Sequence, residues 1–265
     1  MAEVRDRYAR IATGGGGCGC GVGGEADETS MARSIGYAAD ELALAEDANL
    51  GLGCGAPLGF LALQAGETVL DLGSGPGLDA FLAARKVGES GRVIGVDMTP
   101  AMLERARKSA VRHGLPQVEF REGRLEKLPV VDASVDAVTS NCVINLVPDK
   151  AAVFAEIARV LKPGGRIVIS DIVLDGALPK SLEKDIYAYV GCISGAAQRR
   201  DYFGQLTAAG LEGIEVLKDV DYLATVRDAA PVEADSLLGR HGVAWDDVKG
   251  RVRSITFRAR KPLPA

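Results

Sequence analysis

The stretch Asp71-Leu-Gly73-Ser-Gly75-Pro-Gly77-Leu-Asp79 decides the fold. It follows a short apolar segment, residues 68–72, that predicts a strand, and it opens a segment with helical spacing at 79–86. Glycines let the backbone turn tightly and let a ligand approach the backbone amides. The spacing is Gly-x-Gly-x-Gly, and Leu78 stands where a dinucleotide fingerprint needs its third glycine, so a pyrophosphate ligand is disfavoured.

Strand and helix patterns continue to alternate after this turn. The predicted strands are 92–97, 118–121, 135–140 and 166–171, and the predicted helices are 100–113, with Thr99 as N-cap, and 150–161. Further helices are expected at 182–190 and 200–209, and further strands at 214–221 and 253–260. Such alternation is typical of an α/β fold with a parallel sheet and helices on both faces.

The chain divides into four expected parts. Residues 1–30 form a flexible arm rich in Gly and Cys, and residues 31–65 hold a short helix at 37–44 and a lid with Cys54. Residues 66–222 form the core. Residues 223–265 form a C-terminal extension that carries a polar, helical insertion with the sole Trp, Trp245, and the last strand.

Charge and composition exclude several classes of function. The net charge is −5 over 265 residues and no strongly basic tract is present, so no nucleic-acid partner is expected. No apolar run reaches the ~20 residues of a membrane span. The N-terminus lacks an apolar signal core, so a cytoplasmic location is expected, with the five cysteines present as thiols.

Three cysteines lie in separate segments that the fold can bring together. Cys142 follows the fourth predicted strand, at the edge where parallel sheets bind ligands. Cys192 lies in the connection after the fifth strand, and Cys54 lies in the lid before the first. Any one of them alone is more often a small buried hydrophobe, but three thiolates from three segments can enclose one soft atom.

The glycine stretch resembles motif I of the class I S-adenosylmethionine-dependent methyltransferases. Asp97 ends the second predicted strand, where a carboxylate can accept hydrogen bonds from both ribose hydroxyls. Residues 123–129 resemble the adenine-contacting loop of that family, although Arg124 replaces its usual acidic residue. Residues 162–165, Lys-Pro-Gly-Gly, also match.

This resemblance implies a Rossmann-like, mostly parallel seven-stranded sheet and S-adenosylmethionine as cofactor. The cofactor residues that it implies are Asp71, Gly73, Ser74, Gly75, Gly77, Asp79, Asp97, Met98, Leu125, Glu126 and Asn141.

The segment from about 47 to 200 resembles the arsenite methyltransferases of bacteria and archaea. The likeness rests on residues 49–57 (Asn-Leu-Gly-Leu-Gly-Cys-Gly-Ala-Pro), 140–146 (Ser-Asn-Cys-Val-Ile-Asn-Leu) and 192–196 (Cys-Ile-Ser-Gly-Ala), together with 71–79 and 96–100. The family's three arsenic-binding cysteines map onto Cys54, Cys142 and Cys192. The implied function is methyl transfer to thiol-bound arsenite, or to its thiol conjugates, in arsenic detoxification.

The chemistry agrees with this resemblance. Trivalent arsenic is soft and prefers thiolate sulfur, and its lone pair can attack a sulfonium methyl without a catalytic base. Transfer oxidises arsenic by two electrons, and the resemblance implies a cysteine disulfide that thioredoxin or glutathione reduces. Cys18 and Cys20 could capture arsenite or relay disulfides, and an adventitious thiol pair is an equally good reading.

Three alternatives remain open at this stage. A carbon or oxygen methyltransferase of the quinone-methylase type would use the same cofactor motifs and a base such as Tyr187 or Tyr189. A non-enzymatic binder of soft metals would use the thiols alone. Zinc is disfavoured because there is no Cys-x-x-Cys and the cysteine spacings are unlike those of a zinc finger.

Overall fold

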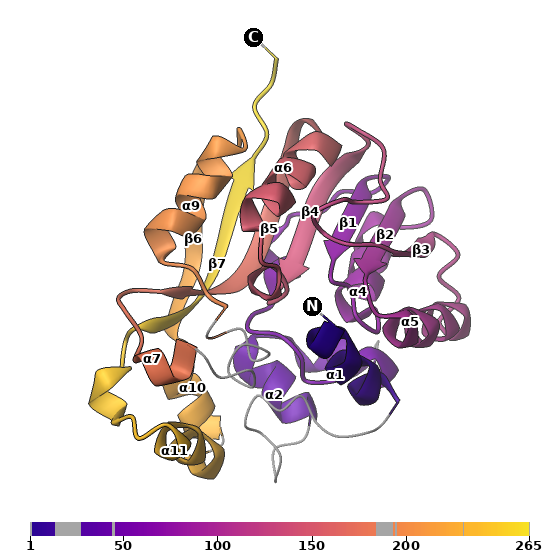
Figure 1. Cartoon of the computed structure of the whole chain (residues 1–265). Coiled ribbons are helices and arrows are strands. Elements are labelled where there is room, and N and C mark those ends of the chain that lie inside the picture. Colours follow the sequence, from indigo (N-terminus) through magenta and orange to yellow (C-terminus); the bar gives the residue numbers. More distant parts are fainter. Residues whose placement is uncertain are drawn as a thin grey trace.

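The computed structural model describes residues 2–13, 28–43, 46–183, 193, 195–229 and 231–264. Within them a seven-stranded sheet runs through the molecule in the order β3-β2-β1-β4-β5-β7-β6 (Figure 1). The strands are β1 (Thr68–Leu72), β2 (Arg92–Asp97), β3 (Val118–Glu122), β4 (Val135–Asn141), β5 (Leu161–Leu174), β6 (Glu212–Asp221) and β7 (Val252–Arg260).

Strands β1 to β5 are parallel to one another, whereas β7 pairs antiparallel with both β5 and β6. The chain leaves β1 toward β2 and β3 on one side and later returns to place β4 and β5 on the other. Strands β1 and β4 are neighbours, and Leu72 pairs with Ser140 at their carboxyl ends. This is a topological switch point, the place where open α/β sheets bind their ligands.

Helices cover both faces of the sheet (Figure 1). One face carries α6 (Lys150–Val160) and α9 (Arg199–Ala208), and the other carries α4 (Leu78–Val87) and α5 (Pro100–Arg112). The N-terminal helices are α1 (Ala2–Ala12), which contacts α5, then α2 (Glu28–Ile35) and α3 (Ala39–Ala43). The later part holds α7 (Lys180–Glu183), α10 (Tyr222–Ala229) and α11 (Pro231–Arg240).

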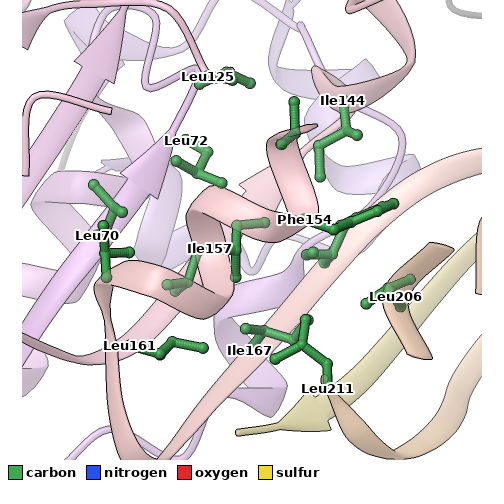
Figure 2. Close-up of a cluster of buried hydrophobic side chains, with 14 of the residues drawn as sticks. Leu70, Leu72, Leu125, Ile144, Phe154, Ile157, Leu161, Ile167, Leu206 and Leu211 are labelled. Atoms are coloured by element: carbon green, nitrogen blue, oxygen red, sulfur yellow. The ribbon is translucent and has the colours of Figure 1, made fainter. Parts of the chain in front are cut away.

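Alternate residues of the central strands feed two separate cores, as the period of a strand requires. On one face Leu70 and Leu72 of β1 meet Phe154 and Ile157 of α6, and Ile167 of β5 lies beside them (Figure 2). On the other face Val69 packs in a cluster that includes side chains of α4 and α5. The sheet is therefore buried on both sides, and ligands reach it at the ends of its strands.

The predicted strands and the α/β class are confirmed. The helix expected at 37–44 begins two residues later, at Ala39, so Tyr37 precedes it. Thr99 stands at the N-cap position of α5, but its side chain makes no capping hydrogen bond. Of the helix expected at 182–190, residues 184–190 lie outside the described part, as do Cys18, Cys20, Tyr187, Tyr189 and Cys192.

The insertion between β6 and β7 is helical, as expected, since α10 and α11 lie there. Among the described residues, no helix combines the length and the apolar character that a membrane crossing needs.

Candidate active site

A cavity with an empty volume of about 1250 Å³, its open mouth included, lies at the carboxyl ends of β1, β2 and β4. Every cofactor residue expected from the sequence lines this cavity except Gly77, and Cys142 lines it as well. Tyr8 of α1 and Tyr222 of α10 add aromatic walls.

The glycines of the turn after β1 differ in what they do. Gly73 and Gly75 line the cavity with φ of +65° and +51°, a region that side chains other than glycine rarely adopt. Gly77, at +102°, is required by packing instead, because a Cβ there would lie 2.7 Å from Phe81 and 2.8 Å from Phe120. The expectation that Gly77 contacts the cofactor therefore has no support in the cavity lining.

Three carboxylates face the cavity at the glycine turn. Asp71 and Asp79 are buried, and burial, together with the negative charge of its neighbours Asp79 and Asp97, raises the pKa of Asp71 well above its usual range. Burial raises the pKa of Asp79 to about 6. The pKa of half-buried Asp97 is also raised by desolvation, although it accepts hydrogen bonds from the backbone amides of Gly75 (3.0 Å) and Thr99 (2.8 Å).

Two polar atoms at this turn are buried without a hydrogen bond to another described residue. Within the described residues, the buried Oδ2 of Asp71 and Oγ of Ser74 have no hydrogen-bond partner. Buried polar groups in folded proteins are nearly always paired, so these atoms indicate a ligand. A cavity with clustered carboxylates suits a cationic ligand, and the sulfonium and ammonium groups of S-adenosylmethionine fit this set of acceptors.

The loop after β3 lies across the cavity from this turn. Leu125 and Glu126, both expected in the cofactor site, line the cavity together with Arg124. The guanidinium of Arg124 forms an ion pair with Glu126 at 2.7 Å. The structure thus pairs Arg124, whose place in the site the sequence left open, with Glu126.

Two of the three predicted thiols converge beside the cavity. The Sγ atoms of Cys54 and Cys142 and a carboxylate oxygen of Asp171 all lie within 4.8 Å of one another. Cys54 is buried, Cys142 is half-buried and neither forms a disulfide. Cys142 holds φ of +60°, a conformation that is costly for a residue with a side chain and that often marks functional sites.

Asp171 is a third member of this cluster that sequence reasoning missed. It is fully buried, and it accepts hydrogen bonds from Asn145 Nδ2 (2.8 Å), Ile172 N (2.9 Å) and Tyr202 Oη (3.0 Å). Burial raises its pKa to about 7. A signal was present, because a lone Asp inside the apolar segment 167–174 is a buried charge that needs a reason.

Tyr37 was also missed as a site residue. It lines the cavity and donates a hydrogen bond to Asp79 Oδ1 at 2.8 Å. No local pattern could have indicated it, because its partners Asp79 and Asn141 lie 42 and 104 residues away in the chain.

Residues 63–219 match the methyltransferase domain family. The chain is 44% identical over 270 residues to an arsenite methyltransferase of Halobacterium salinarum, and the match covers 98% of this chain and 66% of that protein. It is 41% identical over 103 residues to a demethylmenaquinone methyltransferase of Lactococcus lactis, covering 39% of this chain and 41% of the other.

Among solved structures, the arsenic(III) S-adenosylmethionine methyltransferase of Chlamydomonas reinhardtii is similar at 31% identity and a TM-score of 0.62. That match covers 91% of this chain and 76% of the other. By contrast, the matches to the Halobacterium salinarum and Lactococcus lactis proteins span less than two thirds of the length of those relatives. The glycine turn, the switch-point cavity and these matches together show that the chain belongs to the methyltransferase domain family, in the group of the arsenite methyltransferases.

Proposed function

We propose that this protein transfers a methyl group from S-adenosylmethionine to trivalent arsenic held by Cys54, Cys142 and Cys192. The observation that carries the proposal is the placement of Cys54 and Cys142. Their sulfurs lie within 4.8 Å of each other, and Cys142 also lines the cavity of the glycine turn. A soft trivalent atom bound there would lie beside a methyl donor in that cavity.

Cys192 enters the proposal through the resemblance to the arsenite methyltransferases. It lies outside the described residues, but its chain neighbour Ile193 is buried in the same cluster as Cys54. A third thiolate would complete an all-sulfur, three-coordinate site for a trivalent atom that prefers thiolate ligands.

The residues of the cavity divide the work between positioning and charge. When bound, S-adenosylmethionine supplies a methyl group on a positively charged sulfur. Asp71 and Asp79 attract its cationic groups, Asp97 is placed at the end of β2 to accept from ribose hydroxyls, and apolar walls such as Leu50 and Met102 exclude water. Excluding water favours transfer, because the positive charge disperses as the methyl moves.

The proposed transfer moves two electrons from arsenic to the new As–C bond. The arsenic lone pair forms the As–C bond, and the pair of the breaking S–C bond stays on the donor sulfur. Arsenic passes formally from trivalent to pentavalent, and two electrons from thiols return it to the trivalent state. We propose thioredoxin or glutathione as the final reductant of the disulfide that results.

The test is S-adenosylhomocysteine formation on addition of arsenite, with glutathione and a thioredoxin system present. We expect product that depends on arsenite, and we expect Cys142→Ser to abolish it while S-adenosylmethionine binding, followed by calorimetry, stays within twofold to threefold. Full activity of Cys142→Ser would overturn the thiol site. Cofactor binding without arsenite-dependent product would favour a carbon or oxygen acceptor, the reaction named for the quinone-methylase relative.

A further inference from the structure

The side chain of Asn141 joins the two thiol-bearing segments. Its Oδ1 accepts a hydrogen bond from the backbone N of Cys54 at 3.1 Å, and its Nδ2 donates to the carbonyl oxygen of Gly55 at 2.6 Å. The carboxamide therefore grips the lid on either side of the Cys54 α-carbon. Because Asn141 is the residue before Cys142, one residue holds Cys54 by its side chain and Cys142 by its backbone.

The orientation of this carboxamide is fixed by its neighbours. The hydroxyl of Tyr37 donates its proton to Asp79 Oδ1, so toward Asn141 it acts as an acceptor, and Nδ2 lies 2.9 Å from it. The carbonyl of Gly55 also needs a donor, and the amide of Cys54 needs an acceptor. All three contacts select the same orientation, which a flipped amide could not satisfy.

The backbone on both sides of the contact leaves little freedom. A Cβ on Gly53, which has φ of +140°, would lie 2.9 Å from Asn141 Nδ2, so the lid lies directly on this side chain. The amide of Cys142 donates to Ser170 O at 2.8 Å, and the carbonyl of Cys54 accepts from Ser254 Oγ at 2.5 Å. Each thiol thus has one anchor of its own, and Asn141 is the link between them.

We infer that Asn141 is a positioning residue that sets the separation of the Cys54 and Cys142 sulfurs and thereby the affinity of the acceptor site for trivalent arsenic. The inference deepens the proposed function and rests on it for the identity of the acceptor. Tyr37 and Asp79 extend the link by holding the carboxamide in its orientation.

The experiment uses the full chain with Cys18, Cys20 and Cys192 replaced by serine, which leaves Cys54 and Cys142 as its thiols. The probe is phenylarsine oxide, which forms two As–S bonds with two nearby thiols and releases one water. Its dissociation constant is measured by titration at the absorbance of the arsenic–thiolate bonds. Circular dichroism and the midpoint of urea unfolding report whether each variant is folded.

We expect Asn141→Ala to raise the dissociation constant at least tenfold in this background. Asn141→Asp keeps the acceptor for Cys54 N and loses the donors, so its effect is intermediate, and Tyr37→Phe has a smaller one. Gln117→Ala is the control, because Gln117 carries a half-buried carboxamide that donates to Ala84 O and lines neither the cavity nor the thiol segments. Its dissociation constant should stay within twofold.

With all cysteines present, Asn141→Ala should raise the KM for arsenite at least tenfold, and by a larger factor than the KM for S-adenosylmethionine, since Asn141 also lines the donor cavity. The inference would be overturned if folded Asn141→Ala bound phenylarsine oxide as tightly as its parent protein does. It would also be overturned if the probe bonded to only one of the two thiols in the parent protein. If the dissociation constant of the probe rises in the expected order across the variants but the protein shows no arsenite-dependent methylation, the role of Asn141 is supported and the proposed function is refuted.

Discussion

Gly73, the first residue after β1, lies directly against the side chain of Val143, which follows Cys142 at the end of β4. A Cβ on Gly73 would come within 2.5 Å of Val143 Cγ2, closer than real Cβ contacts. The cofactor turn and the thiol segment therefore touch at a position that has no room for a methyl group.

Gly73→Ala is expected to weaken S-adenosylmethionine binding at least tenfold, because the clash and a φ of +65° both displace the turn. Gly88→Ala is its control, since Gly88 has a similar φ of +69° but open space around it. Calorimetry should give a dissociation constant within twofold of wild type for Gly88→Ala. Equal losses in both variants would show that strain rather than the Val143 contact matters.

The affinity for S-adenosylmethionine should depend on pH through Asp79. Its pKa is about 6, so it is charged at pH 7.5 and takes up a proton as the pH falls to 5. The charged form attracts the cationic ligand, and affinity should fall by up to about tenfold per pH unit below pH 6. Asp79→Asn should bind more weakly at pH 7.5 with a flatter profile. A wild-type affinity that is constant from pH 5 to 7.5 would contradict this role.

Asp171 should make the protein less stable as pH rises. Its pKa is raised by burial from the usual 3.8 to about 7, so the unfolded chain loses its proton first and stability falls between about pH 4 and 7. At about 1.4 kcal/mol per pKa unit, the whole effect approaches about 4 kcal/mol. Neutral Asp171→Asn, which keeps the shape, should therefore gain stability relative to wild type at pH 7.5 but not at pH 4.5.

Urea unfolding of both proteins at these two pH values measures the difference. If Asp171→Asn loses the same amount of unfolding free energy at both pH values, the hydrogen bonds from Asn145 and Tyr202 matter more to stability than the buried charge does.

Trp245 should report arsenite binding. It packs against the buried cluster that contains Cys54, and the guanidinium of Arg227 lies 4.8 Å above its ring. Arsenite should change the tryptophan emission of the wild type, and this change should vanish in Cys142→Ser. As the chain has one Trp, the signal has one source. The same emission change in Cys142→Ser would place the arsenic elsewhere.

The sequence predicted the parts of the fold that local patterns encode. Short segments rich in apolar and β-branched residues predicted β1, β2 and β4, and the glycine turn located the cavity, because both signals depend on neighbours in the chain. Tyr37 could not be found this way, since its role comes from Asn141, 104 residues later. Asn141 was expected in the cofactor site, which it lines, but its hold on Cys54 depends on a lid whose place no local pattern specifies.

The sequence located the start of α5 at Thr99 and Pro100, but it did not predict which partners the polar side chains would choose. Thr99 was expected to cap α5, yet its side chain makes no such bond, and the amide of Thr99 instead donates to Asp97. Asp171 was overlooked because strand patterns count apolar residues and do not register one buried carboxylate among them.

The carboxylates of the glycine turn have a consequence for turnover. Asp71, Asp79 and Asp97 gather negative charge at one end of the cavity, and the ligand proposed for it arrives with a positive sulfur and leaves with a neutral one. The attraction that helps to load the donor therefore weakens at the moment its methyl departs. The same three side chains that attract S-adenosylmethionine thus favour release of S-adenosylhomocysteine, and this weakens inhibition by that product.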